Sequence, residues 1–212
     1  MTWVVDHLGD LGRVSLQHLW LALIPVLAGL LVSLPLGWVA ARWRIARAVL
    51  VPAAGLLYTI PSLALFVMMP LVLGTQILDP LNVQVALTIY TVALLVRAVA
   101  DALSAVPESV TAAATAMGYR GAGRFFAVEL PLAVPVLIAG VRVAAVSNIS
   151  LVSVGALIGV GGLGAFLTEG YQRDNYPEII AGIVLILLLA LVVDALLNVL
   201  GRVLTPWAVE RS

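Results

Sequence analysis

Few residues of this 212-residue chain are able to do acid–base, nucleophilic or metal chemistry. The sequence has no cysteine, which excludes a thiolate metal site and a cysteine nucleophile. Its only histidines, His7 and His18, have no further metal ligands beside them, so we predict no metal site and no catalytic group. Lysine is also absent, and with it any phosphate-binding loop of the GxxxxGKS or GxxxxGKT kind. If ATP drives a process involving this chain, another subunit binds the ATP and magnesium, and no cofactor is expected here.

The most informative polar side chains lie inside long apolar segments, where a hydroxyl or amide needs a partner or a water-filled space. They fall on three stretches, and together they predict a shared polar pathway. The expected lining residues are Tyr58, Thr59, Ser62, Thr88, Thr91, Ser147, Asn148 and Ser150. For any single serine or threonine, the alternative is a hydrogen bond back to a carbonyl of its own helix. Asn148 is the hardest to explain in that way.

Two charges, Arg142 and Asp194, lie farther inside apolar segments than any others. An unpaired charge at such a depth is costly, so we expect the two side chains to form a structural ion pair, to face the bundle interior or to reach a cytoplasmic vestibule.

The elements that position these residues are membrane-spanning helices. The chain is 63% hydrophobic and only 10% charged, whereas soluble domains are about a quarter charged. The net charge is zero and the arginines are scattered, which argues against nucleic-acid binding. We predict an all-α fold, a single domain of residues 1–212 with five spans at about 19–41, 50–73, 83–104, 132–157 and 179–203. The apolar stretch 151–167 leaves a sixth, re-entrant element open.

Prolines and small residues indicate how these spans are shaped and packed. Pro52, Pro61 and Pro70 predict that the second span is not a straight rod. Gly29 and Gly37, with Ser33 between them at four-residue spacing, predict a close packing seam on the first span.

The arginines indicate the orientation, since cytoplasmic loops retain positive charge. With five spans, one face holds Arg13 and Arg173. The other holds Arg42, Arg44, Arg47, Arg97, Arg120, Arg124, Arg202 and Arg211. We therefore expect the N-terminus outside the cell and the C-terminus in the cytoplasm.

A short surface helix is predicted at about 107–120, between the third and fourth spans. Pro107 suits a helix start, the alanines that follow have high helix propensity, and Gly118 suits a helix end. Because this helix is small and apolar, it needs a partner to cover it. The residues expected to make that contact are Ala112, Ala113, Ala114, Met117, Gly118, Tyr119 and Arg120.

A glycine-rich stretch follows the fourth span, at what would be its outer end. Glycine allows non-helical turns and close approach of backbones. The residues concerned are Gly159, Gly161, Gly162 and Gly164. A flexible loop is nearly as good an interpretation of them as a built structure. Glu169, Arg173, Asp174 and Glu178 then offer a polar rim beside this stretch.

Several of these segments resemble a known family. The stretch Ala112–Gly118 followed by Leu130 and Pro131 resembles the coupling motif of type I ABC importer permeases, with Ala112 in place of the usual glutamate. Residues 58–66, YTIPSLALF, are similar to the second-helix signature of the osmoprotectant permeases. Residues 139–142 and 158–164 match later segments of that family, and the resemblance extends from about Leu19 to Leu204.

The resemblance implies a permease subunit of the bacterial inner membrane with the type I importer fold, like that of the methionine permease. It implies import of glycine betaine, carnitine or choline. The partners implied are a second identical or homologous permease, two cytoplasmic ABC ATPases docked on the 107–120 helix, membrane lipid and an extracytoplasmic binding protein near an outer gate at the glycine-rich stretch. A permease for methionine or another amino acid stays open, as does an ion-coupled secondary transporter, which would require an inverted repeat and poised intramembrane acids.

Overall fold

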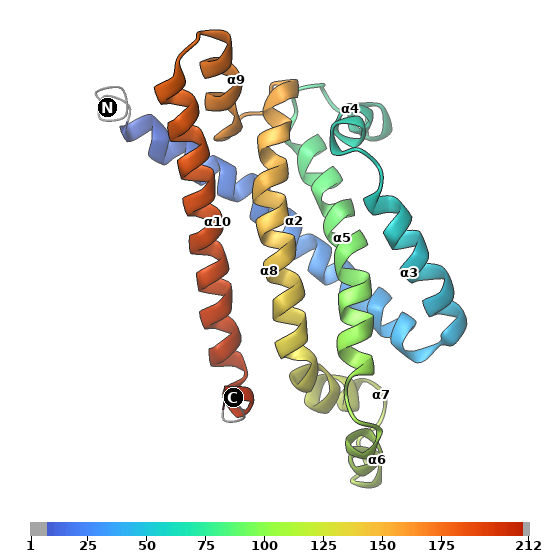
Figure 1. Ribbon diagram of the computed structural model, residues 1–212. Helices are drawn as coiled ribbons and strands as arrows, with labels where there is room; N and C mark the ends of the chain where they lie inside the picture. Colours follow the sequence, from blue (N-terminus) through green and yellow to red (C-terminus); the bar gives the residue numbers. More distant parts are fainter. Residues whose placement is uncertain (1–7, 210–212) are drawn as a thin grey trace.

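The computed structural model describes residues 8–209, and within them it is built of helices without strands (Figure 1). His7 and Arg211 lie outside the described residues. In chain order the elements are α2 (Leu8–Arg42), α3 (Arg44–Tyr58), α4 (Ser62–Leu73), α5 (Pro80–Ser104), α6 (Glu108–Ala116), α7 (Gly121–Arg124), the π-helix η1 (Phe125–Glu129), α8 (Leu130–Gly155), the 3-10 helix η2 (Ala156–Ile158), α9 (Gly164–Gln172), α10 (Tyr176–Leu204) and α11 (Pro206–Val209).

Four helical segments of the described chain are long and apolar enough to cross a membrane. They are Gly9–Arg42, Pro80–Ser104, Gly121–Ile158 and Tyr176–Leu204. A fifth crossing exists only if α3 and α4, which meet at an angle of 102°, count as one broken span. The bend expected within the second span, 50–73, is thus confirmed, and it lies between α3 and α4. The segment after α8 forms the nine-residue helix α9, which is too short to be a span.

The break between α3 and α4 has a local cause. Pro61 has no N–H to donate and disfavours helical backbone at Ile60, so the chain leaves the helix there and α4 begins after Pro61. The carbonyl of Ile60 then accepts a hydrogen bond from the hydroxyl of Tyr90 on α5. This side chain supplies the partner that a broken helix in a membrane otherwise lacks.

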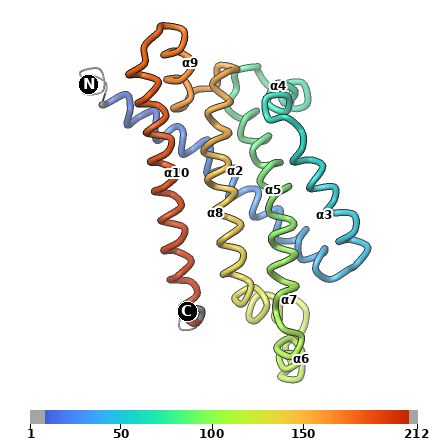
Figure 2. The backbone as a smooth tube through the Cα atoms, viewed as in Figure 1, coloured from blue at the N-terminus to red at the C-terminus, as the bar shows by residue number. Residues whose placement is uncertain are grey.

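Helix α5 lies at the centre of the bundle, and α2 crosses behind it at a slant (Figures 1 and 2). Gly29 and Gly37 of α2 face Thr91 and Val99 of α5 so closely that any Cβ there would collide with them. The predicted packing seam is thus confirmed, and α5 is its partner. Buried leucines of these two helices, with Ile149 of α8, form the main core.

The two ends of the bundle carry different short elements (Figure 1). At one end lie α4, α9 and the start of α2. At the opposite end, α6 and α7 protrude, and α10 ends there as well. The helix expected at 107–120 corresponds to α6, which ends at Ala116.

Candidate functional site

Helix α6 presents a surface of mostly small side chains at one end of the bundle. Only Ala114 on it is buried, at 1% exposure. Ala112 and Ala113 are exposed, as is Arg120. Just after the helix, Met117 is 72% exposed and Tyr119 is 42% exposed. Small side chains next to a large exposed methionine make a surface that a partner's groove is able to cover.

Gly118 ends α6 in a left-handed conformation with φ of 93°. The Gly118 N–H donates to the carbonyl of Thr115, and the Tyr119 N–H donates to the carbonyl of Ala114 over 3.0 Å. These two bonds are the Schellman arrangement, which satisfies carbonyls that the helix end leaves free. A Cβ at Gly118 would meet nothing within 4 Å, so backbone conformation alone requires glycine here.

The residues expected to line a polar pathway divide between two environments. Asn148 and Thr91 are buried inside the chain, where the Asn148 amide donates to the Thr91 hydroxyl over 3.0 Å and to the carbonyl of Ala22 over 3.3 Å. Together they fasten α8 to α5 and α2. Two of the other hydroxyls bond back to their own helix, Thr88 to Gln84 and Thr59 to Leu56.

The remaining pathway candidates lie at or near the surface of the chain. Tyr58 and Ser150 are exposed, and Ser62 and Ser147 are half-buried. Tyr58 packs edge-on against Tyr90 with ring centroids 5.7 Å apart. It also lines a cavity of 290 Å³ between α3 and α5, together with Arg97. An aromatic ring and a cation therefore share a space beside the broken helix.

The glycine-rich stretch 159–164 is packed on the bundle. Val160, Gly162, Leu163 and Gly164 are buried. Gly162 has φ of 94°, and a Cβ there would lie 3.0 Å from Nδ1 of His18. A Cβ at Gly164 would lie 2.6 Å from the carbonyl oxygen of Ser153 on α8. Gly159 has a positive φ as well, and Gly161 lies against the side chain of Gln17. These contacts define a fixed backbone path over the ends of α2 and α8.

His18 holds this stretch in place, a role that the sequence did not reveal. The side chain is fully buried. Its Nδ1 accepts a hydrogen bond from the Leu163 N–H over 3.1 Å, and its Nε2 lies 2.9 Å from the carbonyl oxygen of Ile149. A neutral ring with its proton on Nε2 satisfies both contacts. The available signal was a histidine in an apolar span, which needs a partner in the membrane.

The polar rim beside α9 is smaller than its sequence indicates. Glu169 and Arg173 form an exposed ion pair of 3.1 Å. Asp174 is exposed at a turn with φ of 53°. Glu178 does not belong to the rim, because its side chain is buried and accepts a hydrogen bond from the Asn175 amide.

Arg142 of α8 and Asp194 of α10 form a bidentate ion pair, with N–O distances of 2.8 Å and 2.7 Å. Two parallel hydrogen bonds from a guanidinium to a carboxylate fix the relative register of the two helices. Because both carboxylate oxygens accept from Arg142, binding of a transported ion by Asp194 would compete with this pair.

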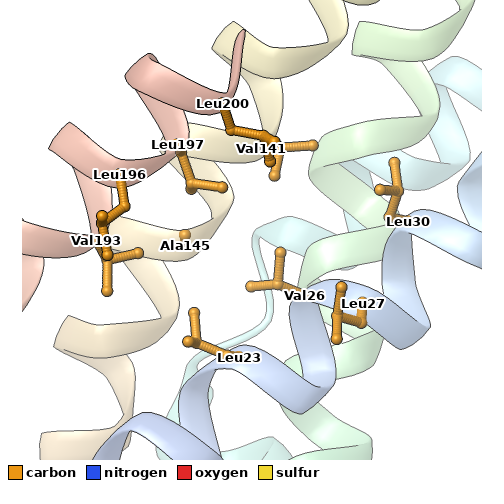
Figure 3. Close-up of a pocket in the computed structure, with 10 residues that line it drawn as sticks. All are labelled: Leu23, Val26, Leu27, Leu30, Val141, Ala145, Val193, Leu196, Leu197 and Leu200. Carbon is orange, nitrogen blue, oxygen red and sulfur yellow. The ribbon is translucent and has the colours of Figure 1, made fainter. Parts of the chain in front are cut away.

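An apolar groove separates α2 from α10 over α8 (Figure 3). It encloses 280 Å³. The side chains around it are all aliphatic: Leu23, Val26, Leu27, Leu30, Val141, Ala145, Val193, Leu196, Leu197 and Leu200. Without a donor, acceptor or aromatic face, the groove offers nothing to recognise a polar solute, so we do not place the pathway there.

Comparison with known proteins relates nearly the whole chain to one group. Residues 33–208 match the family described as binding-protein-dependent transport system inner membrane component. The chain is 37% identical over 207 residues to the osmoprotectant import permease protein OsmW of Salmonella typhimurium, covering 96% of both chains. It is 32% identical to the choline transport system permease protein OpuBB of Bacillus subtilis, covering 96% of this chain and 92% of that protein.

A solved structure with the same fold is an inward-facing form of the MetNI methionine ABC transporter. The TM-score is 0.84, and the match covers 94% of this chain and 98% of that one. The sequence identity is 23%, so this likeness concerns the fold alone.

Proposed function

Because this chain belongs to the family of binding-protein-dependent transport system inner membrane components, we propose that it forms the pathway by which small osmoprotectants enter the cell. The chain is a permease subunit of an ABC importer and lies in the inner membrane. The expected solutes are glycine betaine, carnitine and choline. The support for this class comes from two relatives matched along nearly their whole length, an osmoprotectant import permease and a choline transport permease.

The proposed topology has five crossings, with α3 and α4 counted as one broken span and the N-terminus outside. Its support is the distribution of charge along the described chain. Arg42, Arg47 and Arg97 lie toward the end that carries α6, and Arg120 and Arg124 follow α6 directly. Arg13 and Arg173 lie toward the opposite end, near α9. Positive charge is retained on the cytoplasmic side, so α6 is assigned to the cytoplasm.

The proposed assembly contains two permeases, two ATPases and an extracytoplasmic binding protein. Five helices enclose little room for a solute, so the pathway is placed between two copies or homologues. Each α6 docks on one ATPase, which binds the ATP and magnesium. The binding protein docks at the opposite end, where Glu169 and Arg173 are exposed beside the glycine-rich stretch 159–164.

In the proposed mechanism, ATP binding draws the two α6 helices together and switches the permease pair between two packings. Tyr58, Thr59, Ser62, Thr88, Ser147 and Ser150 are the candidates to face the pathway between the copies. Thr91 and Asn148 have a different role in this scheme, since both are buried within one chain and hold α5, α8 and α2 together. The glycines at 159–164 form the outer gate, and His18 fixes its backbone through the hydrogen bond from the Leu163 N–H.

Solute selection is assigned to the binding protein, in which an aromatic cage would hold a quaternary ammonium by cation–π attraction. An ion-coupled carrier is disfavoured because Asp194, the acid expected farthest inside an apolar segment, is bound to Arg142 through both oxygens.

The observation that carries the proposal is an exposed, alanine-rich helix, ended by a structured glycine cap, in a chain of this family. The test is uptake by proteoliposomes containing the permease with its ATPase and binding protein. Labelled glycine betaine, carnitine or choline should accumulate only with internal ATP, and an ATPase variant unable to hydrolyse ATP is the control. Accumulation of methionine in place of these solutes would overturn the substrate class.

A further inference from the structure

A buried carboxylate, Glu129, lies where the elements next to α6 meet the bundle. It is 6% exposed, at the end of η1 and immediately before α8. One of its oxygens accepts hydrogen bonds from two arginines, Arg42 at the end of α2 and Arg124 at the end of α7, both over 2.7 Å. Charge-assisted bonds of this length are the strongest of protein hydrogen bonds.

The same network reaches α6. While Nε of Arg124 binds Glu129, its Nη1 donates to the hydroxyl of Thr115 over 2.8 Å. Thr115 in turn donates to the carbonyl of Thr111 within α6. A chain of polar contacts thus runs from α6 through Arg124 and Glu129 to Arg42 on α2.

Apolar contacts reinforce the network at α2. Trp38 of α2 packs edge-on against Phe125 of η1, with centroids 6.3 Å apart. The Arg42 guanidinium lies 5.7 Å from the centre of the Trp38 ring. The arginine that binds Glu129 is therefore held from two sides, and its position is fixed with that of η1.

On its other side, α6 is joined loosely. Residues 105–107 connect it to α5, and a cavity of 340 Å³ opens between the first turn of α6 and the ends of α2 and α5. Helix α6 packs chiefly against α7 and η1. From α7 onward the chain is helical without interruption as far as Ile158, so α7, η1 and α8 form one continuous helical segment. A π-helical turn within a longer helical segment is often found at a functional position.

We propose that Glu129 is the link that makes α6 move with η1 and with the adjoining ends of α8 and α2, while residues 105–107 act as the hinge between α6 and the end of α5. This inference rests on the proposed docking of the ATPase on α6. Displacement of α6 then reaches α8 through the continuous helix and α2 through the Glu129–Arg42 contact. Without the carboxylate, the two guanidinium groups lose the anion that they share, and the end of α2 at Arg42 keeps only the Trp38–Phe125 contact with η1.

The test uses spin labels, because the chain has no cysteine to interfere. In the complex of permeases and ATPases, Ser109→Cys on α6 and Arg44→Cys beside the end of α2 carry the labels. The distance between them should stay constant when ATP is added. In Glu129→Gln it should change on ATP binding, and the solute imported per ATP hydrolysed should fall by about tenfold, because Arg42 and Arg124 then have only a neutral acceptor.

The matched control is Asp101→Asn, which removes a carboxylate at the same end of the bundle whose ion-pair partners, Arg47 and Arg97, lie in α3 and α5. It should keep the constant distance and the parent's import per ATP. If Glu129→Gln does not reach the membrane, Thr115→Val tests the same network from an exposed position and should lower import per ATP severalfold.

If the label distance changes with ATP in the parent, the proposed role of Glu129 as a link is refuted. Unchanged import per ATP in both Glu129→Gln and Thr115→Val would refute it as well. A parent that binds its ATPase but imports another solute would refute the substrate class and leave the distance test valid. A parent that does not bind the ATPase would refute both proposals.

Discussion

Replacement of Gly118 by alanine isolates the backbone requirement of the docking helix. Gly118 has φ of 93°, and a Cβ there would meet nothing within 4 Å, so the substitution adds conformational strain and no collision. A left-handed conformation costs a residue with a Cβ about 1–2 kcal/mol. If the ATPase binds only the native conformation of the helix end, this strain lowers the apparent affinity of the ATPase for the permease. A cost of about 1–2 kcal/mol corresponds to a loss of about 5- to 30-fold.

The assay is co-purification of the ATPase, followed by titration of the detergent-solubilised permease with the ATPase. Gly118→Asn should lose less than Gly118→Ala, because asparagine adopts the left-handed conformation more readily than other residues with a Cβ. Gly123→Ala is the matched control. Gly123 lies in α7 without positive φ and with nothing near its Cβ position, so its substitution should leave ATPase binding unchanged. Equal affinities for Gly118→Ala, Gly123→Ala and the parent would refute the reasoning.

Three further predictions concern the bundle. Arg142→Ala should lower thermal stability in detergent, and adding Asp194→Ala should restore part of the loss, because the second change removes the unpaired acid. Strictly additive losses would contradict an energetic contact between the two side chains. His18→Ala leaves the buried Leu163 N–H unpaired at a cost of about 1–3 kcal/mol, so hydrogen exchange in residues 159–164 should rise while that of α6 stays constant. Tyr90→Phe removes the donor to the carbonyl at the α3–α4 break, and proteolysis near residues 59–61 should increase by about fivefold if that bond contributes about 1 kcal/mol; unchanged cleavage would show that the break does not depend on it.

Local features of the fold follow from sequence because their causes are local. Apolar length reveals the spans, and Pro61 reveals a bend in the second of them. The 102° angle of that bend is not local, since Tyr90 on another helix supplies the hydrogen bond that satisfies the free carbonyl. Small residues at four-residue spacing predict a seam, but only the structure identifies Thr91 and Val99 as its partners.

The polar sites depended on contacts across long stretches of sequence. His18 bonds to groups 131 and 145 residues away, which no local pattern indicates. In the sequence, Glu129 looks like an ordinary polar residue of a connection between spans. Only the structure shows that Arg42, 87 residues away, binds its carboxylate. Thr91 and Asn148 share a polar, mid-membrane character with the pathway candidates. A sequence alone does not separate side chains that face a pathway from those that fasten helices inside one chain.

The measurement that tests the account most directly is the side of the membrane on which α6 lies. Met117→Cys introduces one thiol into a cysteine-free chain at a position that is 72% exposed. In membranes of known orientation, an impermeant maleimide should label this thiol only from the cytoplasmic side, and bound ATPase should protect it. Labelling from the external side, or labelling that the ATPase leaves unchanged, would contradict the proposed coupling.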